Sequence, residues 1–311
     1  YKIIIKGDEK AKDENKKHDL VMEFKPNRAQ KRLIASLWHR NVILKARQLG
    51  FTTLVCIIWL DTALFSENVR CGIVAQDREA AEAIFRDKVK FAYQNLPELL
   101  RLKMPLARDS ASELLFAHNN SSIRVATSMR SGTIHRLHVS EFGKICAKYP
   151  DKAVEVITGS IPAVPLNGIL IIESTAEGQD GEFYNITQRA KALFDAKTEL
   201  SMRDYRYHFF AWWDEPKYVM PLGNIKFTDR DNQYFERIEA QINRQLTIEQ
   251  RAWYVATRDA DFSGSEEKMW QEYPSTPEEA FQQSTEGCYY VDQLTKARKE
   301  NRISTVPHVE G

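Results

Sequence analysis

The chain has 311 residues, of which 43% are hydrophobic and 28% charged, and these are ordinary fractions for a folded globular protein. Its formal net charge of +1 excludes a bulk basic field, so contact with nucleic acid would have to come from a local patch. No apolar run reaches the ~18 residues of a membrane span and no secretory signal peptide opens the chain, so we expect no membrane association.

The cysteines are scattered and form no C-x-x-C pair; they are Cys56, Cys71, Cys146 and Cys288. This spacing predicts reduced thiols in a cytosolic protein, rather than a disulfide framework or a zinc site.

Two different segments precede the first strongly apolar strand. Residues 1–19 contain a run of alternating charges without apolar anchors, which predicts a charged N-terminal segment that is solvated or disordered. A helix is expected next, with Asn27 as its N-cap and apolar residues at helical spacing. Gln30 lies in its first turn, and a glutamine amide offers both a donor and an acceptor to the edge of adenine. Taken alone, Gln30 is better explained as a surface residue of an amphipathic helix.

The stretch with the most informative pattern lies between the apolar run Val42–Leu44 and the apolar helical pattern Leu54–Leu60. A strand, a short polar loop with a glycine and a helix opening on threonines form the layout of a phosphate-binding (Walker A) loop. The first amides of a helix have no partner inside it and point outward at its positive end, where an anionic phosphate can bind. We therefore expect ATP to contact Lys45, Ala46, Arg47, Gln48, Leu49, Gly50, Phe51, Thr52 and Thr53.

This loop departs from the usual pattern, G-x-x-x-x-G-K-[ST]. Ala46 stands at its start where a glycine is usual, and Phe51 stands where the lysine that neutralises the β- and γ-phosphates should be. Arg47 and Lys45 are the candidates to replace that lysine, and the Thr52 hydroxyl is the candidate ligand of Mg²⁺. The alternative is a plain strand–turn–helix connection.

The next elements alternate between strand and helix, which predicts a parallel α/β sheet. The run Cys71–Ala75 is typical of a buried strand, and Asp77 caps a helix that continues to about Leu96. The segments Glu113–Ala117 and Ile123–Thr127 flank a polar turn and predict a β-hairpin. A basic run, Arg101, Lys103 and Arg108, is more simply a solvated charged face than a DNA contact.

Leu137–Phe142 is an apolar strand that ends in an acidic residue, Glu141. A carboxylate at the end of a parallel strand points into the crevice where ligands bind, and Glu141 would there orient or activate an attacking water. Ser140 stands where an aspartate is common, and its hydroxyl can still hold a magnesium-bound water. We therefore name Glu141 as the catalytic carboxylate and Ser140 as a metal-site residue.

A third buried strand, Gly168–Ile172, leads to Ser174 and Thr175, which are placed to hydrogen-bond the water or the terminal phosphate and report its loss. A turn before the helix Gly181–Arg189, where serine and threonine are common, explains these two residues equally well. The run Tyr205–Phe210 alternates like a strand. From residue 214 to 285 helical patterns predominate, and the many aromatic residues there are more often core than a stacking platform.

Together these motifs resemble the large terminase subunit of tailed bacteriophages. The matching parts are Gln30, the loop Ala46–Thr53 with its Arg-Gln-x-Gly hallmark, the acidic strand Leu137–Phe142, the coupling motif Ser174–Gly178, and the segments Met269–Pro274 and Glu278–Phe281. The resemblance implies a P-loop NTPase fold of the ASCE (RecA-like) type, in which helices flank a mostly parallel sheet and a small helical lid lies on the C-terminal side. It divides the chain into an ATPase core at 20–213, a lid at 214–285 and a linker at 286–311 toward a nuclease domain.

The same resemblance implies an ATPase that uses ATP and Mg²⁺ to drive double-stranded DNA into a procapsid, without sequence choice. Nuclease activity is not expected, because no cluster of aspartates follows Phe281. Expected partners are the portal protein and the small terminase subunit, with a ring of copies on the portal, a monomer in isolation, and the host cytoplasm as the location. Arg47 would offset transition-state charge, and a second arginine would act on a neighbouring subunit, with Arg130 favoured over Arg136. For Arg130 and Arg136 alike, an ordinary surface arginine without a catalytic role is an equally good interpretation.

Two other functions remain open. A helicase-like or other DNA-dependent ATPase would need a second motor domain or a strand-separating element, and the sequence shows neither. A degenerate module that binds nucleotide without turnover is favoured by Phe51 and Ser140.

Overall fold

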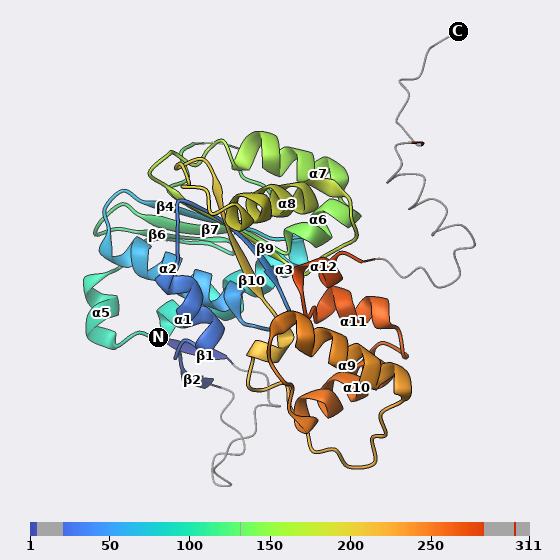
Figure 1. The fold of residues 1–311 in the computed structure, drawn as a ribbon. Helices are drawn as coiled ribbons and strands as arrows, with labels where there is room; N and C mark the ends of the chain where they lie inside the picture. The colour runs from blue at the N-terminus through green and yellow to red at the C-terminus, as the bar shows by residue number, and fades with distance from the viewer. Residues whose placement is uncertain (5–20, 131, 283–301, 303–311) are drawn as a thin grey trace.

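The computed structural model describes residues 1–4, 21–130, 132–282 and 302 (Figure 1). The charged run of the N-terminal segment, Cys288 and nearly all of the predicted linker lie outside the described residues. Two short strands, β1 (Lys2–Ile4) and β2 (Val21–Glu23), pair antiparallel beside the main body. Among the described helices, none is both long enough and apolar enough to cross a membrane.

The centre of the described chain is an eight-stranded sheet. In order of pairing, its strands are β10 (Tyr205–Phe210), β3 (Arg40–Lys45), β9 (Ile169–Ser174), β8 (Arg136–Ser140), β4 (Arg70–Val74), β7 (Ser122–Ala126), β6 (Glu113–Phe116) and β5 (Leu106–Asp109). From β10 to β7 all neighbours are parallel, while β6 pairs antiparallel with both β7 and β5. The predicted mostly parallel α/β sheet and the hairpin are confirmed.

Helices cover both faces of this sheet (Figure 1). One face packs against α1 (Arg28–Ala35), α2 (Phe51–Phe65) and a continuous helical segment made of α3 (Arg78–Ile84), η2 (Phe85–Lys90) and α4 (Phe91–Gln94). The other face packs against α6 (Phe142–Lys148), α7 (Pro150–Glu155), the π-helical η3 (Val156–Ser160) and α8 (Gly181–Asp195). Every residue of β3 is buried, as expected for a central parallel strand covered on both sides.

The helix predicted from Asp77 to about Leu96 is present, and its middle, η2, is π-helical. Several elements were not predicted. The strand β1 lies inside the N-terminal segment that was expected to be solvated or disordered, and α6 directly follows the acidic strand. The short helix α5 (Glu98–Lys103) contains no buried residue, and β5 has a mostly exposed pattern, so neither carries the apolar periodicity that a sequence search detects.

The helices after β10 form a separate layer at the carboxyl ends of the parallel strands (Figure 1). They are the short η4 (Trp212–Asp214), α9 (Asp229–Ile242), α10 (Ile248–Asp261), α11 (Glu266–Glu272) and α12 (Pro277–Ala280). We call α9–α12 the lid. Trp212 of η4 and Tyr254 of α10 are fully buried and pack with ring centroids 5.1 Å apart, so these aromatics are core.

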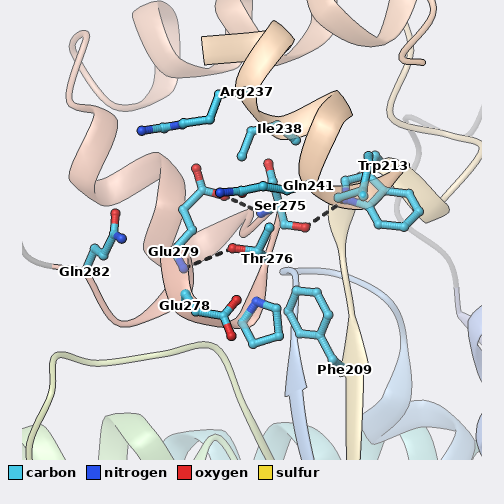
Figure 2. A pocket seen from close by; sticks show the side chains of 12 residues that line it. Phe209, Trp213, Arg237, Ile238, Gln241, Ser275, Thr276, Glu278, Glu279 and Gln282 are labelled. Atoms are coloured by element: carbon cyan, nitrogen blue, oxygen red, sulfur yellow. Dashed lines mark hydrogen bonds between the residues drawn. The ribbon is translucent and has the colours of Figure 1, made fainter. Parts of the chain in front are cut away.

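A buried polar cluster fastens the lid to the strand end. The Ser275 hydroxyl accepts a hydrogen bond from Trp212 Nε1 at 2.9 Å and lies 2.8 Å from the Tyr234 hydroxyl. Tyr234 donates to Glu279 Oε1 at 2.6 Å, and the Ser275 amide donates to Glu279 Oε2 at 2.6 Å. Figure 2 shows Ser275 and Glu279 of this cluster along a pocket of about 530 Å³ between α9 and α12.

The Glu279 cluster should make folding pH-dependent. Burial raises the pKa of Glu279 to about 7, although its hydrogen bonds act in the opposite direction. Because the folded state holds this proton more tightly than the unfolded chain, its stabilisation is greatest at acid pH and is lost as the pH rises through about 7. We expect the free energy of unfolding to fall by about 2–3 kcal/mol between about pH 5 and pH 8, measured by urea titration. Glu279→Gln, which stays neutral, should flatten that profile; an unchanged slope would contradict this assignment.

Candidate active site

The predicted phosphate loop connects β3 to α2 at the carboxyl edge of the sheet. The amides of Ala46 and Arg47 donate to the carbonyls of Phe210 and Glu272, each at 2.8 Å. Across the described chain, the amides from Gln48 to Thr53 donate to no protein acceptor. Gln48 and Gly50 are left-handed, with φ of 60° and 74°. Successive free amides around left-handed residues at a helix N-terminus form a concave anion site.

The loop carbonyls, in contrast, are all held from behind. The side-chain amide of Asn27 donates from Nδ2 to Leu49 O at 3.1 Å, and Gln30 Nε2 donates to Gly50 O at 2.7 Å. Gln30 is buried, and its Oε1 accepts the Asn27 backbone amide at 2.9 Å. A Cβ at Gly50 would lie 2.8 Å from Gln30 Nε2, and a φ of 74° is strained for other residues, so this position favours glycine. The structure thus places Gln30 against the loop backbone, with its amide group already engaged.

Two residues that follow η4 hold the first half of the loop. The Tyr218 hydroxyl donates to Arg47 O, and Lys217 Nζ donates to Gln48 O at 2.7 Å. Every carbonyl from Arg47 to Gly50 therefore has a donor on the protein side, which turns the peptide planes so that their amides face the open side.

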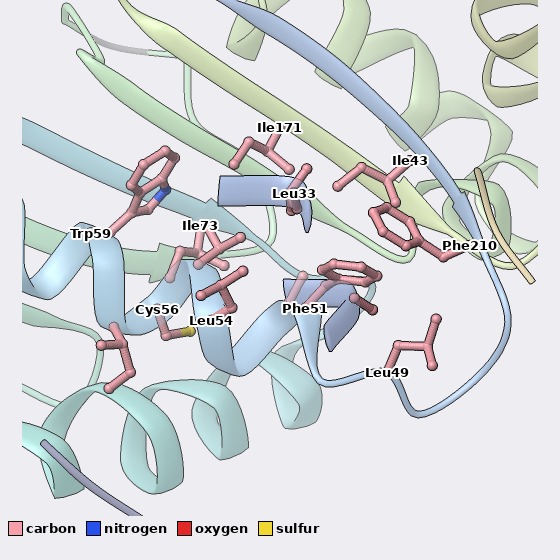
Figure 3. Packing of buried hydrophobic residues seen from close by; sticks show 14 of the residues in the cluster. Leu33, Ile43, Leu49, Phe51, Leu54, Cys56, Trp59, Ile73, Ile171 and Phe210 are labelled. Atoms are coloured by element: carbon pink, nitrogen blue, oxygen red, sulfur yellow. The ribbon is translucent and has the colours of Figure 1, made fainter. Parts of the chain in front are cut away.

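Phe51 does not face the concave anion site formed by the free amides of residues 48–53, which we call the amide cradle. Its side chain is only 1% exposed and packs on Phe210, with ring centroids 4.6 Å apart (Figure 3). It anchors the loop helix to β10, which explains how a phenylalanine is accommodated at the lysine position of the usual pattern.

Restoring the usual lysine at this position should therefore fail. In Phe51→Lys an ammonium would replace a core ring, and we expect a loss of about 3–5 kcal/mol in the free energy of unfolding, as for deletion of a buried aromatic ring. Differential scanning calorimetry and ATP titration would measure this. A variant with wild-type stability and tighter ATP binding would show that the side chain can leave the core.

Lys45, the last residue of β3, supplies the buried cation of the site. Its ammonium lies 3.1 Å from Glu141 Oε1 and 3.1 Å from Glu173 Oε2. Burial alone would lower the pKa of Lys45, but the two carboxylates outweigh it and hold that pKa above its usual value. Glu173 has no exposed surface, and burial opposes its charge, yet Lys45 keeps its pKa well below the usual range. Both groups are charged at neutral pH.

Two hydroxyls converge on the same carboxylate. Ser140 Oγ donates to Glu173 Oε1 at 2.8 Å, and Thr52 Oγ1 donates to it at 3.1 Å. The two hydroxyls are 3.4 Å apart, and the buried His138 ring lies 3.4 Å from the same carboxylate oxygen. Within the described ranges, no group of three or more His, Cys, Asp and Glu residues could hold a metal by itself. Hydroxyl oxygens beside a carboxylate fit Mg²⁺, which usually takes few protein ligands and completes its shell with phosphate and water.

Glu173 was not predicted as a site residue. The signal was present in the sequence, since Glu173 lies at the end of an apolar strand in the same way as Glu141. Parallel pairing places it beside Ser140, its direct register partner in β8.

Glu141 lies where the acidic strand ends, in a left-handed conformation with φ 54°. Its Oε1 contacts Lys45, while its Oε2 is buried and has no hydrogen-bond partner among the described residues. Lys144, one turn further on, lies 3.8 Å from that oxygen. The left-handed backbone at Glu141 thus accompanies a carboxylate with one oxygen on Lys45 and the other without a hydrogen bond.

The predicted arginines lie outside this centre. Arg47 Nη1 is 3.7 Å from Glu272 Oε2 at the end of α11, and its side chain is half exposed. Arg130 pairs with Glu155 at 2.6 Å on the outer helical layer, with 62% of its side chain exposed. Arg136 donates to the neighbouring His135 carbonyl. The structure thus brings Lys45, rather than an arginine, to Glu141.

Ser174 and Thr175 are fully buried at the end of β9, and their hydroxyls have no hydrogen-bond partner within the described part of the chain. A side chain on Gly143 would lie 2.8 Å from Ser174 Oγ, so α6 packs closely over this turn. Two residues further on, Glu177 Oε2 accepts a 2.7 Å hydrogen bond from Gln271 of α11. This turn therefore connects the acidic centre to the lid.

The fold has known counterparts among solved structures. The ATPase domain of the Thermus phage P74-26 large terminase is similar with a TM-score of 0.52 and 18% identity, over 81% of this chain and 94% of that one. The HK97 bacteriophage large terminase gives 0.51 and 17%, over 81% of this chain and 50% of that one, so this chain spans about half its length. No protein-family model and no curated protein sequence matches the chain. These likenesses show the fold, which is that of large terminase ATPase domains.

Proposed function

We propose that this chain is the ATP-hydrolysing motor part of a viral terminase that moves double-stranded DNA into a procapsid. The observation that carries the proposal is the convergence of Lys45, Glu141, Thr52 and Ser140 beside a loop of free amides. Cation, carboxylate, hydroxyls and amides are the parts that phosphoryl transfer to water requires. The fold shared with large terminase ATPase domains supports the choice of motor.

In this proposal the amides from Gln48 to Thr53 and the Lys45 ammonium bind the phosphate chain of ATP, and Lys45 takes the role of the missing lysine. Thr52 and Ser140 would hold Mg²⁺, which would neutralise charge on the phosphates. Glu173 accepts from both hydroxyls and fixes their orientation. Glu141 accepts a hydrogen bond, and then a proton, from the water that attacks the terminal phosphate.

The remaining roles are also proposals. Arg47 would leave Glu272 for the phosphates and offset charge in the transition state, and Arg130 would act on a neighbouring copy in a ring. Ser174 and Thr175 would transmit loss of the terminal phosphate. Further expected partners are the portal protein and the small terminase subunit, in the host cytoplasm.

The test is ATP hydrolysis by the chain with Mg²⁺, with and without linear double-stranded DNA, at low and high salt. We expect phosphate release that DNA stimulates, and stimulation that falls steeply with salt because DNA is held through its phosphates. Binding of ATP without turnover at high protein concentration would instead support a degenerate nucleotide-binding module. Strand separation on a forked duplex would support a helicase-like enzyme.

A further inference from the structure

A second lysine, Lys88, contacts the start of α2, the helix that follows the phosphate loop. Lys88 lies in η2 and donates from Nζ to Thr53 Oγ1 at 3.0 Å. Thr53 is in the first turn of α2, directly after Thr52. Successive helical residues are rotated by about 100°, so Thr52 faces the Glu173 carboxylate while Thr53 faces Lys88.

Lys88 makes no ion pair with any residue that the structure describes. Its only hydrogen-bond acceptor in that part of the chain is the neutral Thr53 hydroxyl. By contrast Lys90, two residues on, pairs with Asp109 at 2.7 Å. An ammonium group beside the positive end of a helix, with no anion to offset it, is electrostatically unfavourable in the free protein. Such an arrangement is stabilised when an anion binds between them.

The charge of Lys88 also reaches the buried part of the site. Burial raises the pKa of the Cys56 thiol to about 12, the Lys88 ammonium opposes this rise and the Glu173 carboxylate adds to it. Cys56 lies one turn below Thr53 in α2. Lys88 therefore lies on the side of α2 that carries Thr53 and Cys56.

The backbone around Lys88 is unusual as well. The π-helical geometry of Phe85–Lys90 interrupts an otherwise α-helical segment and changes the direction in which its side chains leave the helix. Such segments are rare and occur frequently at functional sites. Here Phe85 and Val89 stay in the core while Lys88 is directed at the loop helix.

We propose that Lys88 is a second phosphate-binding lysine, which contacts the phosphates that remain in the diphosphate product. The inference rests on the proposed function, since it assumes that the cradle binds a nucleoside triphosphate. In this proposal Lys45, between the two carboxylates, contacts the terminal phosphate of ATP, which is cleaved off. Lys88 contacts the phosphates that stay on the nucleotide. The two lysines should therefore differ in how they affect ATP and ADP.

The experiment compares Lys88→Met, Lys88→Arg and the matched control Lys90→Met by calorimetric titration with ATP and ADP in Mg²⁺, together with the melting temperature of each free protein. We expect Lys88→Met to weaken ATP and ADP alike by about tenfold or more, the loss of one charge-assisted hydrogen bond. Lys88→Arg should recover part of that affinity, and Lys90→Met should bind as wild type does. Without ligand, Lys88→Met should melt at the same or a higher temperature, because an unfavourable charge is gone.

Three outcomes would overturn the inference. The first is that Lys88→Met binds both nucleotides as wild type does while Lys45→Met binds neither. This result would remove Lys88 from phosphate binding and leave the proposed function intact. A lower melting temperature of free Lys88→Met, in step with its loss of affinity, would show a structural role. If wild type itself binds neither nucleotide, the proposed function fails, and the role of Lys88 fails with it.

Discussion

Replacing Glu141 by glutamine is expected to lower the rate of ATP hydrolysis by about 10²–10⁴-fold, the range for loss of a general base, with little change in ATP affinity. The glutamine keeps the size of the side chain but cannot take a proton from water. In the structure Glu141 Oε2 is the carboxylate oxygen without a hydrogen-bond partner among the described residues, so it is the one available to a water molecule.

Single-turnover phosphate release, with ATP binding measured separately, would test this. Glu177→Gln is the comparison variant, because Glu177 is a half-buried carboxyl in the turn after β9 whose charge interacts with Glu141. A Glu141→Gln variant that hydrolyses ATP at the wild-type rate would remove Glu141 from the mechanism. If Glu177→Gln abolished turnover and Glu141→Gln did not, the general base would have to lie in the segment Ser174–Gly178 instead.

Lys45→Met is expected to abolish detectable ATP binding and to destabilise the free protein by about 3–5 kcal/mol, the usual cost of breaking a buried ion pair. The large stability effect follows from Glu173, which is wholly buried and would lose its cation. Urea unfolding and ATP titration measure the two effects independently.

The double variant Lys45→Met with Glu173→Gln separates these two roles. A neutral amide at position 173 can still accept from Ser140, so most of the lost stability should return while ATP binding stays absent. Recovery of ATP binding in the double variant would show that Lys45 only compensates Glu173 and does not contact phosphate.

The sheet was predictable because its central strands are short apolar runs between turn residues. The runs around Val42, Val139 and Ile171 gave β3, β8 and β9, and the glycine-containing loop before two threonines gave the start of α2. Local pattern suffices for such elements, because strands buried on both faces contain near-continuous apolar runs, with the polar residues of β3 and β9 at the strand ends.

The arrangement of the site side chains was less predictable, because it depends on contacts between distant segments. Arg47 looked like the natural substitute for the missing lysine, but a glutamate of α11 lies beside it, far along the chain. Lys45 reaches the carboxylates only because β9 lies between β3 and β8, a strand order that local pattern does not reveal. Gln30, taken alone, was interpreted as a surface residue, with an adenine edge as the alternative. The surface interpretation was wrong, because α1 packs against the loop and buries Gln30 in a hydrogen bond to Gly50 O.

The hydrogen bonds on the loop carbonyls also bear on the order in which the molecule assembles. Lys217 and Tyr218 lie 169 and 171 positions beyond the residues whose carbonyls they hold. During synthesis, therefore, the sheet can form around β3 well before the loop acquires its final shape. A chain ended just after β10 should fold into a stable sheet, yet its peptide planes at Arg47 and Gln48 would be free to rotate. We conclude that competence to hold a polyphosphate arises late, once the segment that contains Lys217 and Tyr218 has docked on the loop.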